Sequence, residues 1–466
     1  MPSSRLSRKI EKVWNMIEDP VQFAQSILKL NITAQQQAIL RSVVKNPRTA
    51  VKASHASGKT FIAAVLVLWF ITRYQEAIVV TTAPTWMQVK RVLWGEIHRI
   101  IRGSDFRYPE PSETLLRLGP SRYAVGVSTN EGVRLQGYHA KHVLFVIDEA
   151  PGVGSDIYEA IEGIRAGGDV RVLALGNPTI ASGPFYDAFT TNREGWSLIT
   201  ISAFDTPNLQ SLPIESLLKL PEEELDNNPV PYLTTRRWVK EKYHEWGPGH
   251  PLWESRVLGN FPAQAEDALL SLTWLEQAKI REHPVDEGIL EGGLDVAGPG
   301  EDETALAIRC GPKLIHLASW TESDPRGKVL AALDPFKGRI KRLNVDSTGI
   351  GYGMARHIAD FKYPVRDINV GVAARRPEKY ANLKAELYWG LRLRFQSGDI
   401  SGCFSEKAIG QLAGIRYQHN ARGQVLIESK DDMRKRGVKS PDLAEAVMLA
   451  FAPDPCAEPR IRSLRD

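Results

Sequence analysis

The stretch Lys52-Ala53-Ser54-His55-Ala56-Ser57-Gly58-Lys59-Thr60 decides the fold of the first part of this chain. It follows a short β-like run, 49–51, and it opens an apolar helix, 61–74. A strand, a loop of small residues, Gly-Lys-Thr and a helix are the context of a phosphate-binding loop, in which backbone N–H groups face phosphate oxygens. Lys59 would reach the β- and γ-phosphates of a nucleotide, and the Thr60 hydroxyl would hold Mg²⁺.

One position departs from the usual G-x-x-x-x-G-K-[ST] pattern, because Ala53 stands where its first glycine would be. Alanine leaves little side chain in the way, and Ser57 and Gly58 keep the close approach to a phosphate. The alternative is a small-residue loop that precedes Lys-Thr by chance. The acidic strand end downstream favours the phosphate-binding loop.

Length and composition set broad limits. The chain has 466 residues, which corresponds to two or three domains of ordinary size. A formal net charge of +4 is compatible with a nucleic-acid partner but does not require one. The 3 cysteines are scattered, so they favour a reducing compartment over a disulfide framework or a zinc cluster. The longest apolar run, 61–71, is too short to span a bilayer, and residues 1–5 do not begin a signal peptide, so no membrane partner is expected.

Apolar strands alternate with helices after the phosphate-binding loop, which predicts a mainly parallel sheet covered on both faces. The expected strands are 77–82, 123–128, 142–147, 170–175 and 196–201. Ligands of such sheets bind at the carboxyl ends of the strands. Polar clusters stand at three of these ends, namely 54–60, Asp148-Glu149 and Gly176-Asn177.

Asp148 and Glu149 follow the near-continuous apolar strand 142–147. Downstream of a phosphate-binding loop, such a pair indicates ATP hydrolysis. Asp148 would bind the Mg²⁺ of the nucleotide, and Glu149 would orient and deprotonate the attacking water. Acids also end strands at ordinary turns, but the position of this pair favours the catalytic interpretation.

Two other assignments stay open from the residues alone. Arg134 lies in a glycine-flanked loop before the acidic strand, where it either stabilises γ-phosphate charge in the transition state or is an ordinary surface arginine. The glutamines 35–37 precede the phosphate-binding loop. A glutamine amide can pair with both the donor and the acceptor of adenine, although solvated helix positions are the favoured interpretation.

Residues 205–285 are punctuated by prolines and are predicted to form a small helical subdomain and linker. Trp238, Trp246 and Trp253 are interleaved there with basic residues. This pattern fits stacking and phosphate contacts with a nucleic acid, and equally well tryptophans that pack on the sheet domain. The predicted domains are therefore 1–205, 206–285 and 286–466.

Three acids in the last domain lie on separate elements: Asp295 near the end of strand 288–296, Asp346 at the end of strand 342–346, and Asp442 at a helix start. Carboxylates on separate elements fit two-metal phosphodiester cleavage, in which two Mg²⁺ or Mn²⁺ ions about 3.5–4 Å apart clamp the attacking and leaving oxygens. Oxygen ligands suit these ions, and no His or Cys cluster indicates zinc. The reserve ligands are Asp302, Asp432 and Glu445.

With these motifs the chain resembles the large terminase subunit of tailed bacteriophages, the ATP-driven DNA-packaging motor. The resemblance covers nearly the whole chain. The matching segments are 52–60, 143–149 and 175–178 in the ATPase part, 205–208 and 259–262 in the linker, and 293–297, 344–346 and 440–446 in the nuclease part.

The resemblance implies an α/β fold, with an N-terminal P-loop ATPase of the ASCE type and a C-terminal RNase H-like nuclease. In that family the first loop glycine is often missing and a basic residue stands near the loop start, as Lys52 does here. The resemblance also makes Gln36 the adenine-reading glutamine, Arg134 the arginine finger, and Asn177 part of the coupling segment. The family more often has Asp where Glu445 stands.

The resemblance further implies ATP with Mg²⁺ in the first domain and Mg²⁺ or Mn²⁺ in the nuclease. The implied partners are double-stranded DNA, the portal protein, the small terminase subunit and further copies of the chain in a ring on the portal. The implied location is the host cytoplasm. Two rivals are a DNA-repair helicase–nuclease, which would need strand-separation motifs, and a non-catalytic ATP-dependent DNA-binding switch, which would have no use for Glu149.

Overall fold

The computed structural model describes residues 17–128, 137–262, 267–285, 288–298, 302–322, 324–348, 351–435 and 439–454. The chain forms two compact units. The first comprises Met1–His244 and Leu252–Pro262, and the second comprises Glu245–Pro251 and Ala263–Asp466. These two units are defined by compactness alone, so they do not test the three predicted domains. The predicted boundaries near 205 and 285 stay a prediction.

The first unit is built on a seven-stranded sheet with the order β3-β4-β2-β5-β6-β1-β7. All neighbouring strands are parallel except the edge pair of β3 and β4. The strands are β1 (Arg48–Ala53), β2 (Ala77–Thr82), β3 (Leu115–Gly119), β4 (Arg122–Gly126), β5 (His142–Ile147), β6 (Asp169–Gly176) and β7 (Ser197–Ile201). Strand β3 was not among the strands expected from the sequence, because its burial is mostly partial and its apolar pattern is short.

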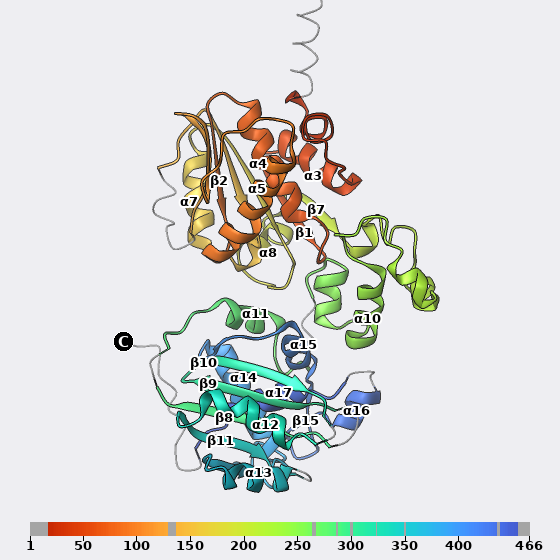
Figure 1. Ribbon diagram of the computed structural model, residues 1–466, viewed down its shortest axis with the longest axis vertical. Helices are drawn as coiled ribbons and strands as arrows, with labels where there is room; N and C mark the ends of the chain where they lie inside the picture. The colour runs from red at the N-terminus through yellow and green to blue at the C-terminus, as the bar shows by residue number, and fades with distance from the viewer. Residues whose placement is uncertain are drawn as a thin grey trace, which may run out of the picture. The chain divides into compact units, whose positions relative to one another are not determined.

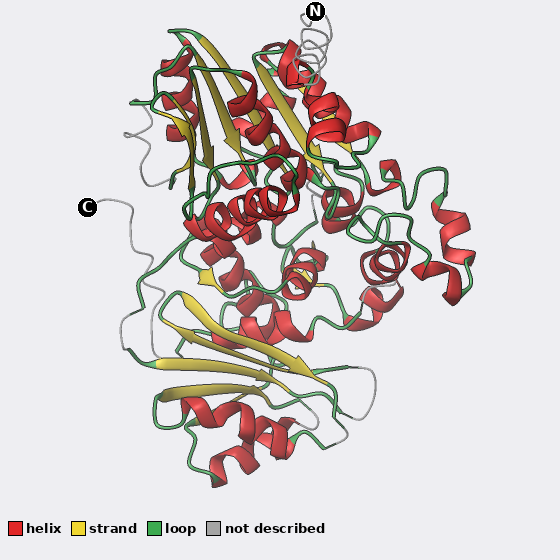
Figure 2. Cartoon of the chain, turned by 45° about the horizontal axis from the view of Figure 1, so that its top comes forward, coloured by secondary structure: helices red, strands yellow, loops and turns green. Residues whose placement is uncertain are grey.

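Helices cover both faces of this sheet (Figures 1 and 2). The helices before the second sheet are α2 (Pro20–Gln22), η1 (Phe23–Ile27), α3 (Ala34–Lys45), α4 (Lys59–Arg73), η2 (Gln88–Leu93), α5 (Trp94–Gly103), η4 (Ala150–Gly152), α7 (Ser155–Arg165), α8 (Pro184–Phe189), η5 (Arg193–Gly195), η6 (Ala203–Asp205), α9 (Ile214–Lys219), η7 (Glu222–Asp226), α10 (Arg236–Trp246) and η8 (Trp253–Val257).

Alternate residues of the central strands enter two separate cores. Leu144 and Val146 of β5 join the core under α3, α4 and α5, whereas Val143, Phe145 and Ile147 join the core under α7 and α8. Successive strand side chains point to opposite faces, so a strand that is apolar at every position must be covered on both sides. This explains why the near-continuous apolar run before Asp148 lies in the middle of the sheet.

The second unit is built on a six-stranded sheet with the order β12-β11-β8-β9-β10-β13. Strands β8, β9 and β10 form an antiparallel meander, and β11 and β12 continue parallel to β8. The strands are β8 (Leu290–Asp295), β9 (Thr304–Cys310), β10 (Lys313–Trp320), β11 (Ile340–Asp346), β12 (Val365–Ile368) and β13 (Ser401–Gly402), and β14 (Tyr417–His419) pairs separately with β15 (Val425–Ile427). The predicted fold class, a mainly parallel α/β unit followed by an RNase H-like α/β unit, is confirmed.

Helices of the second unit also lie on both faces of its sheet (Figures 1 and 2). They are α11 (Leu272–Ile280), α12 (Arg326–Leu333), η9 (Asp334–Phe336), α13 (Gly351–Asp360), α14 (Leu383–Ser397), α15 (Glu406–Gly414), α16 (Lys430–Lys435) and α17 (Asp442–Ala450). Helix α17 packs tightly on β8, because a Cβ at Gly293 would clash with the carbonyl oxygen of Ala446. Glycine at this position therefore lets the second half of α17 lie directly against β8.

None of the helices within the described residues is both long enough and apolar enough to cross a lipid bilayer.

Candidate functional site

The phosphate-binding loop joins β1 to α4 at the carboxyl edge of the first sheet. Gly58 is the N-cap of α4 and has a φ of 77°. Glycine takes this left-handed conformation without the steric cost that other residues meet. A Cβ at Gly58 would also clash with Nε2 of Gln36, so the predicted adenine-reading glutamine packs directly against the loop.

The backbone of the loop is only partly available to a phosphate. The N–H of Ser54 donates to the carbonyl oxygen of Ile201 at 2.8 Å, and the N–H of His55 donates to that of Arg256 at 2.8 Å. Residues 56–60 are all described, and their N–H groups bond to no acceptor among the described residues. The N–H groups of the loop that a phosphate could use therefore begin at Ala56.

Lys59 meets two of the other predicted nucleotide-site residues. Its Nζ donates to Oδ1 of Asn177 at 3.0 Å and lies 3.6 Å from Oε1 of Glu149. Asn177 follows β6, and its Nδ2 donates to the carbonyl oxygen of Ala53 at 2.6 Å. The ends of β1, β5 and β6 thus contribute side chains to one cluster, as expected for neighbouring parallel strands.

The Thr60 hydroxyl donates to Oδ2 of Asp148 at 3.1 Å. Asp148 is 2% exposed. Burial first, and then the charge of Glu149, raises the pKa of Asp148 to about 7. A hydroxyl and a carboxylate are the hard oxygen ligands that Mg²⁺ prefers, and a buried carboxylate gains from a nearby cation. These two side chains therefore fit the expected metal.

Glu149 stands in a strained turn. Its φ is 48°, a left-handed conformation that non-glycine residues rarely adopt. The N–H of Glu149 donates to Oδ1 of its neighbour Asp148 at 3.1 Å, and its side chain is 36% exposed. Such strain persists only where the surroundings hold it and is common at functional positions. Here it accompanies a carboxylate that faces Lys59 and remains accessible to solvent.

Lys52 contacts protein groups on the linker side of the loop. Its Nζ donates to Oδ1 of Asn260 at 3.1 Å and lies 5.7 Å from the ring centres of both Phe189 and Phe261. Burial, and then the charge of Arg193, lowers the pKa of Lys52. Its predicted role at a nucleotide stays a prediction.

Two of the remaining predicted residues, Gln36 and Ser57, form hydrogen bonds with neighbours in their own segments. Oε1 of Gln36 accepts from the N–H of Thr33 at 2.9 Å, which closes a capping box at the start of α3. The Ser57 hydroxyl donates to the carbonyl oxygen of Ser54 at 3.0 Å, within the loop. Arg134 lies outside the described residues, so its predicted role as arginine finger stays a prediction.

The predicted nuclease residues include a buried carboxylate cluster in the second unit. Asp295 ends β8, while Asp442 and Glu445 stand in the first turn of α17. These three side chains belong to residues that are 7%, 4% and 5% exposed. Carboxylates buried to this degree require cations or hydrogen-bond donors.

Two lysines supply much of that compensation. Nζ of Lys430 lies 4.0 Å from Asp295, 3.7 Å from Asp442 and 2.9 Å from Glu445. Nζ of Lys384 donates to the other carboxylate oxygen of Glu445 at 2.5 Å. The ammonium group of Lys430 therefore lies among all three buried acids.

The pKa values follow this arrangement. Burial, and then the charge of Glu445, holds the pKa of Asp295 well above its usual value. Burial likewise raises the pKa of Asp442. Burial opposes the shift at Glu445, but the ammonium groups of Lys384 and Lys430 lower its pKa. Glu445 is therefore the ionised partner of the lysines, whereas Asp295 is the acid whose charge is least compensated.

Asp346 ends β11 and lies at the margin of this cluster. Its Oδ1 accepts from the N–H of Thr348 at 3.0 Å and from the Thr348 hydroxyl at 2.7 Å. Its charge contributes to the raised pKa of Asp295, so the two carboxylates are within electrostatic range. In the part of the chain that the structure describes, no three His, Cys, Asp or Glu side chains are arranged to hold a metal ion. The predicted metal role of Asp295, Asp346 and Asp442 stays a prediction.

The donor set nevertheless has the chemistry of a divalent-cation site. The ammonium group of Lys430 lies within 4.0 Å of Asp295, Asp442 and Glu445, Lys384 pairs with Glu445, and the charge of Asp346 acts on Asp295. The excess negative charge and the oxygen ligands suit Mg²⁺ or Mn²⁺.

The reserve ligands separate into two kinds. Asp302 lies 3.5 Å from Arg434, and Asp432 accepts from Lys435 at 2.7 Å, so both take part in pairs at the surface. Glu445 alone of the three belongs to the buried cluster.

Several contacts at the cluster were not found from the sequence. Besides the two lysines, the Ser440 hydroxyl donates to Oδ1 of Asp442, and the N–H of Glu303 donates to Oδ2 of Asp442 at 2.8 Å. Lys384 of α14 is far from Asp442 in sequence, whereas Lys430 of α16 lies shortly before it, and neither lysine stands in a recognised motif. Only the three-dimensional fold brings them to the acids.

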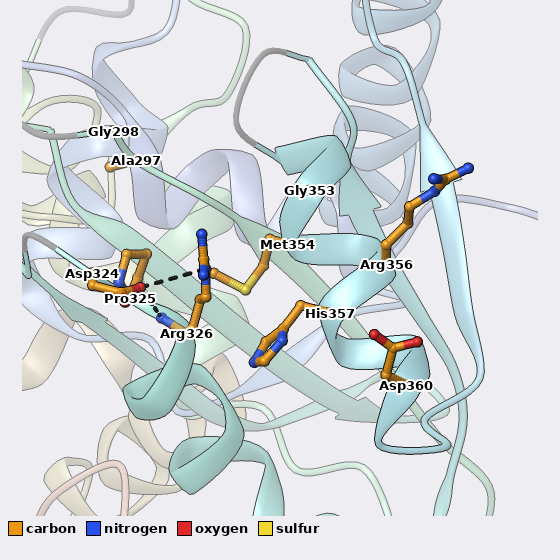
Figure 3. Close-up of a pocket in the computed structure, with 10 residues that line it drawn as sticks. All are labelled: Ala297, Gly298, Asp324, Pro325, Arg326, Gly353, Met354, Arg356, His357 and Asp360. Carbon is orange, nitrogen blue, oxygen red and sulfur yellow. Dashed lines mark hydrogen bonds and ion pairs between the residues drawn. The ribbon is translucent and has the colours of Figure 1, made fainter.

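A hollow of about 600 Å³ lies elsewhere in the second unit, bordered by Arg326 of α12 and His357 of α13 (Figure 3). Ala297 and Gly298, which follow β8, line it as well. None of the predicted site residues lines this hollow.

Together, the fold and the two clusters define a class of protein: a parallel α/β unit with a predicted phosphate-binding loop, joined to an RNase H-like unit with a buried carboxylate cluster. No family model matches the chain. A protein of Enterobacteria phage P7 named "Probable terminase, large subunit" is 24% identical over 479 residues, which span 93% of this chain and 90% of that protein. The predicted resemblance is thereby confirmed: the chain is a homologue of a terminase large subunit.

Solved structures of large terminases are also similar to this chain. A large terminase from a thermophilic bacteriophage is 10% identical, covering 90% of this chain and 98% of that chain with a TM-score of 0.41. The large terminase of bacteriophage HK97 is 13% identical, covering 93% and 98% with a TM-score of 0.39. The nuclease domain of the large terminase subunit gp2 of bacterial virus Sf6 is 19% identical, covering 40% and 99% with a TM-score of 0.34. The fold assignment rests on the strand topology and not on these scores.

Proposed function

We propose that this chain is a viral DNA-packaging motor. ATP hydrolysis in the first unit drives double-stranded DNA into a procapsid, and a two-metal endonuclease in the second unit cuts concatemeric DNA when packaging starts and ends. One observation carries the proposal: Lys59, Asn177 and Glu149 meet within 3.6 Å, next to the bonded pair of Thr60 and Asp148. The homology to a terminase large subunit supports the choice of DNA packaging among the possible uses of an ATPase.

The proposed ATPase mechanism assigns a role to each group of this cluster. The N–H groups of residues 56–60 bind phosphate oxygens, and Lys59 leaves Glu149 to reach the β- and γ-phosphates. Thr60 and Asp148 would hold Mg²⁺, which neutralises charge on the phosphate oxygens. Glu149 then accepts a proton from the attacking water.

The proposed nuclease mechanism uses the carboxylate cluster. Asp295, Asp346 and Asp442 would hold Mg²⁺ or Mn²⁺, which stabilise the attacking and leaving oxygens of the phosphodiester. Before these carboxylates can bind cations, Lys430 must leave its position among them. Glu445 remains bonded to Lys384 and helps to anchor α17.

The proposed partners and location follow from the homology. Double-stranded DNA is the substrate, and the portal protein, the small terminase subunit and other copies of this chain in a ring are the proposed protein partners. The proposed location is the host cytoplasm, with transient binding to the procapsid. Because DNA contacts are mostly with phosphates, we expect DNA affinity to fall steeply with salt.

The experiment that tests the nuclease assignment is cleavage of supercoiled plasmid in Mn²⁺, Mg²⁺ or EDTA. The intact protein should cut with either metal and not with EDTA, and Asp295→Asn should not cut. Asp267→Asn is the matched control, since this acid of the second unit pairs with Arg416 at the surface and its loss should leave cleavage intact. Equal cleavage by the wild type and Asp295→Asn would contradict the assignment.

Turnover measurements separate this function from the two rivals. ATP hydrolysis that DNA stimulates supports a motor. Nucleotide binding with negligible turnover in the presence of DNA would favour a binding switch. Strand separation driven by ATP would favour a helicase–nuclease.

A further inference from the structure

Thr234 binds the phosphate-binding loop from the linker side. It lies shortly before α10 and is 3% exposed. Its N–H donates to the carbonyl oxygen of Ala56 at 3.1 Å, and its hydroxyl donates to the carbonyl oxygen of His55 at 2.5 Å. One residue of the linker thus holds two consecutive carbonyl groups of the loop.

Because the peptide bond is planar, these contacts with the two carbonyl groups also fix the direction of the N–H groups that follow them. In a trans peptide the C=O and the N–H of the next residue lie in one plane and point in opposite directions. The carbonyl of His55 is coplanar with the N–H of Ala56, and the carbonyl of Ala56 with the N–H of Ser57. When Thr234 holds both carbonyls on its own side, both N–H groups point away from it. They are the first two N–H groups of the loop that bond to no acceptor among the described residues.

The loop needs such support, because its backbone is strained at Ala56. The φ of Ala56 is 47°, a left-handed conformation that is unfavourable for alanine because its Cβ crowds the following carbonyl oxygen. Strained backbone persists only where surrounding contacts determine it. The bond from the N–H of Thr234 reaches the carbonyl of this same residue.

Neighbours of Thr234 contact the loop on either side of Ala56. The ring of His55 stacks on that of Trp238, with ring centres 6.1 Å apart and planes 15° apart. Cδ2 of Leu233 would lie 3.4 Å from a Cβ at Gly58. The segment 233–238 therefore follows the loop closely, with Thr234 as its hydrogen-bonding residue.

We propose that Thr234 is a positioning residue for nucleotide binding, which holds the phosphate-binding loop so that the N–H groups of Ala56 and Ser57 face the phosphates. It acts through the loop and is not itself a catalytic residue. The inference rests on the proposed nucleotide site. It adds the linker to the parts of the chain that determine nucleotide affinity.

The test compares Thr234→Val with Thr234→Ser in the full-length protein. Valine keeps the shape of threonine but has no hydroxyl, whereas serine keeps the donor. We expect the Kd for Mg²⁺-ADP, measured by calorimetry, to rise roughly 3- to 10-fold in Thr234→Val, as for the loss of one neutral hydrogen bond. Thr234→Ser should stay within about twofold of the wild type, and the KM for ATP should change more than kcat.

Thr206→Val is the matched control. The Thr206 hydroxyl donates to the carbonyl oxygen of Ala203 at 2.6 Å, and the residue is 3% exposed. This variant therefore loses a buried bond of the same kind without touching the loop, and its Kd should not change. If both valine variants weakened binding equally, Thr234 would have only a general structural role and the proposal would be overturned.

Two further readouts complete the design. If Thr234→Val does not fold, Thr234→Ala removes the same hydroxyl without crowding and should show the same ratio to Thr234→Ser. Amide hydrogen exchange of residue 234, whose N–H donates to the carbonyl oxygen of Ala56, should also be faster in the variant that lacks the hydroxyl. A wild type that binds no nucleotide would refute the proposed function itself. A wild type that hydrolyses ATP, with unchanged affinity in Thr234→Val, would overturn only this inference.

Discussion

The predicted phosphate-binding loop and the buried carboxylate cluster are held by their neighbours in opposite ways. At the loop, the carbonyl groups of Ile201 and Arg256 accept hydrogen bonds from the backbone and Thr234 donates to it, and the N–H groups of residues 56–60 are left without acceptors among the described residues. At the cluster, Lys430 lies among three of the acids at 2.9 to 4.0 Å and already compensates part of their charge.

This difference predicts different costs of binding. A preorganised loop can take a phosphate with little rearrangement, which favours affinity. The cluster must first lose the attraction between Lys430 and its acids before cations can take their place. We therefore expect nucleotide to bind readily to the isolated protein, and nuclease metals to bind weakly until Lys430 is displaced.

The largest effect is expected from variants that test whether the ATPase and nuclease sites act separately. Glu149→Gln removes the base that accepts a proton from water, and it should lower ATP turnover about 10²- to 10⁴-fold. Plasmid cleavage by this variant should be unchanged. Asp346→Asn should abolish cleavage and leave ATP turnover intact. Both activities are measured on the same preparations, and a joint loss in either variant would refute the assignment of the two functions to separate units.

The next effect tests whether Lys430 compensates the acids. Lys430→Met leaves buried carboxylates without their ammonium partner, so we expect the metal-free protein to lose roughly 1–3 kcal/mol of unfolding free energy. Added Mn²⁺ should raise the Tm of this variant more than that of the wild type, because the ion takes the place of the lost charge. Urea unfolding and thermal scans in EDTA and in Mn²⁺ measure both quantities.

Lys435→Met is the control for Lys430→Met. It lies on the same helix, α16, but its side chain is 76% exposed and pairs with Asp432 at the surface. Exposed pairs contribute little to stability, so no measurable change is expected. If the two methionine variants behaved alike, Lys430 would not be the counter-ion of the cluster.

A smaller effect tests the preorganised loop. In Gly58→Ala the left-handed φ of 77° costs roughly 1–2 kcal/mol, and the new Cβ meets the Gln36 side chain. Nucleotide affinity and Tm should both fall. Gly95→Ala is the opposite case, since nothing lies within 4 Å of its Cβ position in α5 and the change should stabilise the helix slightly. A loop that binds nucleotide normally with alanine at 58 would not be preorganised in the manner described.

The smallest effect is the pH dependence of stability at the cluster. Burial and the charge of Glu445 hold the pKa of Asp295 above the value of roughly 4 for an unfolded aspartate. The stability that its proton provides is complete below about pH 4 and is lost as the pH rises through the raised pKa. Asparagine cannot lose this proton. In EDTA, the Tm of Asp295→Asn should exceed that of the wild type at pH 8, and the difference should shrink toward pH 4. A Tm difference that did not change with pH would show that the pKa of Asp295 is not raised.

The sequence predicted which side chains of the first unit come together, because these residues follow local rules. Asp148 and Asn177 each come directly after an apolar strand, and the carboxyl ends of parallel strands share one edge of a sheet. Their positions relative to Lys59 could therefore be inferred before any coordinates. The roles of these residues in ATP hydrolysis stay predictions.

At the carboxylate cluster, local sequence rules were not enough to predict the whole site. The sequence indicated that Asp295 and Asp442 share a site, but not that Lys384 and Lys430 neutralise it. Their pairing depends on the packing of α14, α16 and α17, which no local periodicity encodes. Thr234 was missed for the same reason, because its contacts with His55 and Ala56 cross the sequence from the linker to the loop.

The stacking of His55 on Trp238 gives the protein an intrinsic fluorescence signal at the loop. An imidazole against an indole quenches fluorescence, more strongly when the imidazole is protonated. His55 belongs to the loop that a nucleotide would contact, so loop movement would change the emission of Trp238. The difference spectrum against Trp238→Phe isolates this signal from the other indoles, and the filling of the loop could be followed in real time without a dye.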